Sequence, residues 1–268
     1  MKITHHLIGR HAIEVWAPPT LSPTTPLLVM HDGKNVFNKE TSTVGVTWGV
    51  AEAVEREIAP VHPELQPLIV AVWVPDESRR FQELAPQAVM ERYPQIWDEI
   101  GGPTVSWAIN DRTLRGNDYQ DLLATQVVPW ARETFGITAS RERTAVCGSS
   151  MGALASLYAL ARHPEAWGSA LALSTHLPLG DGLMGAGLAD LLPPPGRHRI
   201  WMDYGDQTLD AAYAPYQAAF DADLSARGWQ FGTDVQTTPF PGHDHSERAW
   251  SARIHLSLIH ISEPTRPY

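Results

Sequence analysis

The chain has 268 residues, of which 43% are hydrophobic and 19% charged, a composition typical of a globular protein with a full hydrophobic core. Its formal net charge of −10, with no cluster of Lys and Arg, argues against nucleic acid or an anionic membrane as a partner. No apolar run approaches the roughly 20 residues that a membrane-spanning helix needs. The N-terminus lacks the apolar stretch of a signal peptide, and we therefore expect a cytoplasmic protein.

Short apolar runs alternate with helical patterns along the chain. Continuous runs predict buried parallel strands at residues 26–30, 68–74, 144–148 and 168–174. Apolar residues at helical spacing predict helices at residues 50–58, 118–136, 154–161 and 208–228. Strands that alternate with helices indicate an α/β fold, with a mostly parallel central sheet and helices on both faces.

The chain has four further features that bear on the fold. Residues 3–8 and 12–16 are expected to add an antiparallel pair of strands at the N-terminal edge. Pro129 is expected to kink its helix. The stretch 76–117 is long and irregular, and it is either a lid-like insertion near a site or a surface excursion. The one cysteine, Cys147, lies in an apolar strand pattern, so no intrachain disulfide is possible.

A serine between two glycines follows the third apolar run. The stretch "GSSMG", residues 148–152, fits G-x-S-x-G between an apolar strand and an amphipathic helix. In this pattern the serine lies on a sharp, strained turn that lifts its hydroxyl above the sheet, and the glycines let neighbouring backbone approach. Ser150 is therefore the candidate nucleophile, and Ser149 is a structural neighbour. The N–H of Met151 is a candidate donor to an oxyanion.

A serine nucleophile needs a base, and the base needs a carboxylate that orients it. With this type of turn the acid follows the serine in the chain, and the histidine comes last. His243 and His245, in "GHDHSERAW", follow a β-like run and are both candidates for the base. The stretch "RIWMDYGDQTLD" supplies three candidates for the acid, which spacing does not separate: Asp203, Asp206 and Asp210.

The second oxyanion donor is expected in the turn after the strand at residues 26–30. The chain reads "HDGKN" there, and its glycine allows backbone N–H groups to approach a ligand. The N–H of Lys34, or that of Gly33, is the candidate.

Together these stretches resemble the putative-esterase (esterase D-like) branch of the α/β-hydrolase superfamily, which includes feruloyl and enterochelin esterases. The matching pieces are "VMHDGKNVF", "CGSSMGALASLYAL", "DYGDQTLDAAYAPYQ" and "HDHSERAW", in that order along the chain. The resemblance implies an α/β-hydrolase fold with Ser150 as nucleophile and His245 as base. It also favours Asp210 as the acid, because relatives commonly read G-T-x-x-L-D there. This chain has Asp206 where threonine is usual, so Asp206 is the runner-up acid.

The stretch "LSLIHISEPTRPY", residues 256–268, departs from the resemblance, since relatives continue with an apolar C-terminal helix. It looks like a translated sequencing adapter joined to a truncated gene, which implies a metagenomic origin. We therefore expect one α/β-hydrolase domain over residues 1–255 and a poorly packed, non-native tail over residues 256–268. Deletion of residues 257–268 is expected to leave activity intact.

The expected activity is hydrolysis of carboxylic esters through an acyl-enzyme, on aromatic or short acyl groups, with a small-molecule ester as the partner. One alternative is an acyltransferase with the same triad, which product analysis with added alcohol would reveal. The other is a catalytically silent binding protein, which an organophosphonate would not label. His243 and His245 have no further metal ligands of matching pattern, and no cofactor motif is present, so no metal or cofactor is expected. The oligomeric state stays open.

Overall fold

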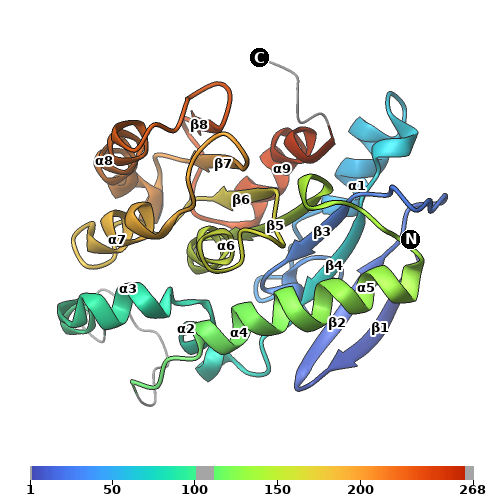
Figure 1. Cartoon of the computed structure of the whole chain (residues 1–268), viewed down its shortest axis with the longest axis horizontal. Helices are drawn as coiled ribbons and strands as arrows, with labels where there is room; N and C mark the ends of the chain where they lie inside the picture. The colour runs from blue at the N-terminus through green and yellow to red at the C-terminus, as the bar shows by residue number, and fades with distance from the viewer. Residues whose placement is uncertain (1, 101–111, 263–268) are drawn as a thin grey trace.

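The structure is a computed structural model that describes residues 2–100 and 112–262. Within these residues eight strands form one sheet (Figure 1), in the order β1-β2-β4-β3-β5-β6-β7-β8. The bounds are β1 Ile3–Ile8, β2 His11–Trp16, β3 Leu27–Met30, β4 Leu68–Val72, β5 Thr144–Ser149, β6 Ser169–Leu173, β7 Arg199–Tyr204 and β8 Val235–Pro239. The β1–β2 and β2–β4 pairs are antiparallel, and every pair from β4 to β8 is parallel. The predicted mostly parallel sheet and the antiparallel N-terminal pair are confirmed.

Both faces of the central strands are covered. Side chains of successive strand residues point to opposite faces of a sheet. In β3, Leu27 and Val29 belong to one hydrophobic cluster, whereas Leu28 and Met30 belong to the other, and all four are fully buried. The continuous apolar run in the sequence therefore reflects two buried faces rather than one.

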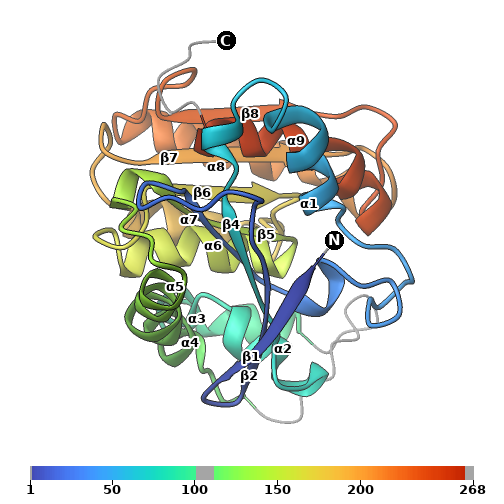
Figure 2. The ribbon, with the colours of Figure 1, turned by 90° about the vertical axis from the view of Figure 1, so that its right-hand side faces the viewer.

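Helices make up the outer layers. Their bounds are α1 Val50–Ala53, α2 Glu77–Leu84, α3 Gln87–Arg92, α4 Gly116–Leu122, α5 Val128–Phe135, α6 Met151–Arg162, α7 Leu183–Leu191, α8 Tyr213–Ala226 and α9 Glu247–Ser262. Apolar residues of α1 and α9 join the cluster on one face of the sheet, and those of α2 to α8 join the cluster on the other. Figures 1 and 2 show the two helical layers with the sheet between them.

The stretch 76–117 is more regular than its sequence suggests. It contains α2, α3, the 3₁₀ turn Pro94–Asp98 and the beginning of α4. Phe81 and Trp97 pack with ring centroids 5.5 Å apart, and both are buried. The prediction of a long irregular stretch is therefore wrong for residues 77–98, because short helices show too few turns to produce a clear apolar period. Residues 101–111, which include Trp107, lie outside the described residues.

Helix boundaries also differ from the predictions at three places. The helix expected at 50–58 consists of α1 and a π-helical segment, Val54–Ile58. The helix expected at 118–136 consists of α4, a π-helical segment Leu123–Val127, and α5. Pro129 lies near the beginning of α5, where its missing N–H is tolerated, and the irregular segment directly precedes it. The helix expected at 208–228 begins as the 3₁₀ turn Thr208–Ala212 and continues as α8.

The tail is better packed than predicted. Helix α9 continues through residue 262, and Ser257 and Leu258 are 0% and 1% exposed. Leu258 belongs to the cluster that α9 forms with α1. The expectation of poor packing is wrong for these two residues, because Leu258 extends the apolar face of α9 and the buried Ser257 hydroxyl donates to the Ile254 carbonyl at 2.8 Å. Residues 263–268 lie outside the described residues, and the non-native origin of the tail stays a prediction.

No helix between residues 2 and 100 or between residues 112 and 262 has the length and hydropathy to cross a membrane.

Replacing Leu258 tests whether the end of α9 is part of the core. Because this side chain is buried, Leu258→Ala is expected to lower the free energy of unfolding by about 2–5 kcal/mol, measured by urea denaturation. Val61, which is 66% exposed, offers the matched control, and Val61→Ala is expected to change stability by less than about 0.5 kcal/mol. Equal stabilities of the two variants would contradict the packing of α9 described above.

Candidate active site

The predicted nucleophile lies on a strained turn between β5 and α6. Ser150 has φ 55° and ψ −117°, a conformation that side-chain-bearing residues rarely adopt. Its backbone N–H donates to the Leu173 carbonyl at 2.9 Å, which attaches the turn to the end of β6. A Cβ at Gly148 would lie 2.3 Å from the Gly152 carbonyl oxygen, so glycine is required at position 148. The backbone at Gly148 and Gly152 therefore approaches as closely as the G-x-S-x-G pattern predicts, and this close approach permits the sharp turn at Ser150.

The predicted base and one predicted acid are in direct contact. His245 Nδ1 lies 2.6 Å from Asp210 Oδ1. The Asp210 carboxylate also accepts hydrogen bonds from the Ser174 hydroxyl at 2.6 Å and from the Gly205 N–H at 2.7 Å. Burial acts to raise the pKa of Asp210, but the hydrogen bonds from His245 and Ser174 hold it below its usual value. Asp210 is therefore an anion at neutral pH, and the His245 proton facing it is fixed on Nδ1.

A buried network of side chains holds the Ser174 hydroxyl that donates to Asp210. Ser174, which has φ 43°, accepts hydrogen bonds from Trp250 Nε1 at 3.0 Å and from the Arg253 guanidinium at 2.7 Å. Arg253 also donates to Asp203 Oδ1 at 2.9 Å. With both of its acceptor positions filled, the Ser174 hydroxyl directs its own proton to Asp210. None of Ser174, Trp250 and Arg253 has a local sequence signal for this role, because α9 and the end of β6 meet only in the folded chain.

The other predicted acids and the other predicted base do not take part in this contact. Asp203 is inside β7 and pairs with Arg253, so it does not follow the strand as a loop residue would. Asp206 is exposed, and it accepts the Gly242 N–H at 2.7 Å. The His243 carbonyl accepts the N–H of Asp206 at 3.0 Å, and Nδ1 of the His243 ring has no hydrogen-bond partner among the described residues. Among the described residues, Asp210 and His245 are thus the only predicted acid and predicted base whose side chains are hydrogen-bonded to each other.

The turn after β3 faces the same region. It begins at Asp32, with φ 52°, and continues as the 3₁₀ turn Gly33–Asn35. A Cβ at Gly33 would lie 2.5 Å from Trp73 Cδ1 and 2.8 Å from the Ala71 carbonyl carbon. Glycine at this position therefore allows the turn to lie directly against β4.

Three backbone donors are available near this turn. The N–H groups of Gly33, Lys34 and Met151 have no hydrogen-bond acceptor among the described residues. The nearby Asp32 carboxylate is paired instead with Arg80, which donates to both of its oxygens, at 2.7 and 2.6 Å. Free N–H groups at the beginning of a helix and in a tight turn are suited to bind an oxyanion.

The predicted nucleophile and the predicted base open onto one cavity of about 350 Å³. Ser150 and His245 both line it, together with Lys34, Leu209 and Trp250. Among the described residues, the His245 ring is hydrogen-bonded to Asp210, and no hydrogen bond joins it to the Ser150 hydroxyl. Rotation about one side-chain bond changes the partner of a serine hydroxyl, and catalytic hydrogen bonds are often formed only when substrate is bound.

A metal site is not found in this region. Across the described part of the chain, no group of three or more His, Cys, Asp and Glu side chains is arranged to hold a metal ion.

The family model described as "Putative esterase" matches residues 111–259, more than half of the chain. A search of the curated proteins finds no match. The chain therefore belongs to the putative esterase family, and its fold is the α/β-hydrolase fold.

Similar solved structures include two named as esterases and one named as a siderophore hydrolase, all at low sequence identity. The enterobactin esterase FES from Shigella flexneri is 17% identical with a TM-score of 0.67, and the match covers 99% of this chain but 60% of that one. The siderophore hydrolase EstA from Aspergillus nidulans is 17% identical with a TM-score of 0.66, covering 94% of this chain and 90% of that one. A ferulic acid esterase is 12% identical with a TM-score of 0.66, and the match covers 98% of both chains. At such identities these structures establish the fold.

Two buried histidines near the site predict a loss of stability in mild acid. Burial lowers the pKa of His31 and that of His176 from 6.5 to about 4. Between these values the unfolded chain binds protons that the folded chain does not, so stability is complete above pH 6.5 and falls as the pH falls towards 4. The loss by pH 4 is about 3 kcal/mol for each histidine.

Urea denaturation across this pH range tests the prediction. His31→Gln and His176→Gln are each expected to reduce the slope of stability against pH, whatever their stability at neutral pH. The side chain of His5 is 72% exposed, and His5→Gln is expected to keep the wild-type slope. A wild-type slope in all three variants would show that the two buried rings do not control acid stability.

Proposed function

We propose that the chain hydrolyses small carboxylic esters through a Ser150–His245–Asp210 triad and a covalent acyl-enzyme. The observation that carries this proposal is the 2.6 Å contact between Asp210 and His245, in a cavity that Ser150 and His245 share. Membership in an esterase family supports the reaction class.

The proton path follows from the hydrogen bonds of His245. Its Nδ1 carries the proton that Asp210 accepts, so Nε2 has the free lone pair that a general base needs. Ser150 Oγ attacks the ester carbonyl while Nε2 takes its proton, and the same proton then passes to the leaving alcohol. Water enters next and gives a proton to Nε2 while its oxygen bonds to the acyl carbon. Ser150 Oγ then leaves the acyl carbon and takes the proton from Nε2, which frees the carboxylic acid product and regenerates the base. Asp210 stays ionised throughout and stabilises the imidazolium.

The oxyanion of the tetrahedral intermediate is expected to bind to backbone N–H groups. Met151 supplies one donor from the beginning of α6, and Lys34 or Gly33 supplies the other from the turn after β3. The unpaired state of these groups among the described residues supports this assignment. Each donor of this kind contributes roughly 3 kcal/mol to transition-state stabilisation.

Cavity size and lining favour a small substrate. A volume of about 350 Å³ is near the lower end of the range for ligand pockets. Trp250 and Leu209 give part of the lining an apolar character suited to an aromatic or short acyl group. The names of the similar structures, which include a ferulic acid esterase, support aromatic acyl esters as the substrates to examine first.

Replacement of the two aspartates tests the assignment of the acid. An asparagine at position 210 cannot stabilise the imidazolium and favours the wrong tautomer of His245, so Asp210→Asn is expected to lower kcat by about 10⁴-fold. Asp206→Asn keeps an oxygen that accepts the Gly242 N–H, and it is expected to keep wild-type kcat. The measurement is steady-state hydrolysis of p-nitrophenyl and hydroxycinnamate esters, with Ser150→Ala as the inactive reference. Wild-type kcat in Asp210→Asn would remove Asp210 from the mechanism.

A further inference from the structure

The backbone of the predicted oxyanion turn is held in an uncommon conformation. Asp32 directly precedes the N–H groups of Gly33 and Lys34, and it has φ 52° and ψ 45°, in the left-handed region. Residues with a side chain enter this region rarely, Asn and Asp most readily among them. Rotation at Asp32 would move the whole turn and change the directions of the two following N–H groups. The contacts that fix Asp32 therefore also fix the predicted oxyanion donors.

One arginine of α2 fixes the Asp32 side chain. Arg80 Nε donates to Asp32 Oδ1 at 2.7 Å, and Arg80 Nη2 donates to Asp32 Oδ2 at 2.6 Å. Two parallel bonds define the plane of a carboxylate as well as its position. The side chain of Asp32 is 3% exposed and that of Arg80 is 25% exposed, so water screens the pair only weakly. Burial acts to raise the pKa of Asp32, but Arg80 holds it below its usual value, and Asp32 is therefore an anion at neutral pH.

The turn has a second anchor one residue earlier. His31 is fully buried, and its Nδ1 is hydrogen-bonded with the Tyr119 hydroxyl of α4 at 2.9 Å. The His31 N–H donates to the Cys147 carbonyl of β5, also at 2.9 Å. Helices α2 and α4 are joined in turn, since the Arg115 N–H, directly before α4, donates to the Gln82 carbonyl of α2 at 2.8 Å. Two successive side chains of the turn are therefore held by two connected helices.

The anchored turn lies against the beginning of α6, which carries the other predicted donor. A Cβ at Gly152 would lie 3.3 Å from His31 Cβ and 3.4 Å from Asp32 Oδ2. A shift of the Asp32 carboxylate therefore changes the spacing between the turn after β3 and the Met151 N–H. An oxyanion accepts hydrogen bonds from both places only when this spacing is right, and a misplacement of about 1 Å can slow a reaction about 100-fold.

We propose that Arg80 is a positioning residue for ester hydrolysis: it holds Asp32 and thereby aims the N–H groups of the turn after β3 at the oxyanion. The inference rests on the proposed function, since the oxyanion forms on the ester that Ser150 attacks. It gives a role to the stretch 76–117, which carries Arg80 and leads into α4. Arg80 also lines the cavity of Ser150, so a direct contact with the substrate is the competing explanation.

The two explanations differ in their kinetic effects. The oxyanion forms only during the reaction, so a displaced turn lowers kcat and kcat/KM together and leaves KM unchanged. Loss of a contact with the bound ester raises KM instead. The explanations also differ at Asp32. If Arg80 acts through Asp32, changes at the two positions remove the same interaction, and their effects do not add.

The test is steady-state hydrolysis of p-nitrophenyl acetate by Arg80→Lys, Asp32→Asn and the double variant, with thermal melting as the check on folding. Lysine keeps the charge but not the two parallel bonds, and asparagine tolerates the left-handed conformation but lacks the charge. Each single variant is expected to lower kcat by about 10- to 100-fold at unchanged KM. The double variant is expected to be no slower than the slower single variant.

Arg92 of α3 provides a matched control for the arginine. It pairs with Asp190 at 2.8 Å, and its side chain is 54% exposed. It does not line the cavity of the predicted nucleophile. Arg92→Lys is therefore expected to keep both the wild-type kcat and the wild-type KM.

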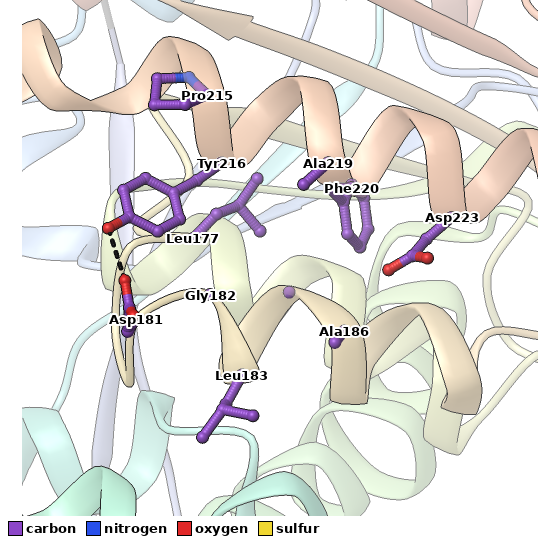
Figure 3. Close-up of a pocket in the computed structure, with 11 residues that line it drawn as sticks. Leu177, Asp181, Gly182, Leu183, Ala186, Pro215, Tyr216, Ala219, Phe220 and Asp223 are labelled. Carbon is purple, nitrogen blue, oxygen red and sulfur yellow. Dashed lines mark hydrogen bonds between the residues drawn. The ribbon is translucent and has the colours of Figure 1, made fainter.

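The second anchor offers an independent check. Tyr119→Phe removes the hydrogen bond of His31 but leaves the Arg80 pair in place, so it is expected to lower kcat at unchanged KM, by a smaller factor than Arg80→Lys. Tyr216 of α8 supplies the control, since its hydroxyl donates to Asp181 Oδ1 at 2.8 Å. Figure 3 shows this pair at a separate cavity of about 510 Å³ between α7 and α8. Tyr216→Phe is expected to keep the wild-type kcat.

Three results would overturn the inference: wild-type kcat in either single variant, losses that multiply in the double variant, or a raised KM at unchanged kcat in Arg80→Lys. If Arg80→Lys does not fold, wild-type kcat in Asp32→Asn or in Tyr119→Phe has the same consequence. Ser150→Ala separates the two levels. If it stays active, the proposed function fails, whereas an inactive Ser150→Ala beside a fully active Arg80→Lys removes the inference alone.

Discussion

A single buried charge organises this site. Asp210 is 1% exposed, and its carboxylate depends on the three donors supplied by His245, Ser174 and Gly205. Without them, burial would shift the carboxyl to its neutral form, and His245 would lose both its orientation and its tautomer. Each donor comes from a different loop at the same edge of the sheet. The need to satisfy this charge therefore fixes how the loops after β6, β7 and β8 meet.

Helix α9 also contributes to the hydrogen-bond network around the Asp210 carboxylate. Trp250 and Arg253 of α9 donate to Ser174, and Arg253 forms a buried ion pair with Asp203 inside β7. Removing one partner of such a pair typically costs 3–5 kcal/mol, because the other charge stays buried and unpaired. Helix α9 is thus part of the support of the site, and the buried Leu258 near its end extends the same packing.

The central strands and the serine turn could be predicted from the sequence, because each depends on residues that are close together in the chain. Continuous apolar runs predicted the central strands, and the close glycine contact at Gly148 explains why the G-x-S-x-G pattern marks a strained serine. The choice among three aspartates could not be made from spacing, since it depends on the 3₁₀ turn that returns Asp210 towards His245. Arg253, 79 residues from Ser174, carries no sequence signal because its partners meet only through the fold.

A crystal structure of the protein after reaction with an organophosphonate tests the central claim most directly. The account predicts phosphorus bonded to Ser150 Oγ and a phosphoryl oxygen within about 3 Å of the Met151 N–H and of the Gly33 or Lys34 N–H. It also predicts that His245 Nε2 faces the adduct while Nδ1 keeps its contact with Asp210. A bond to any other residue, or a phosphoryl oxygen out of reach of these N–H groups, would contradict the account.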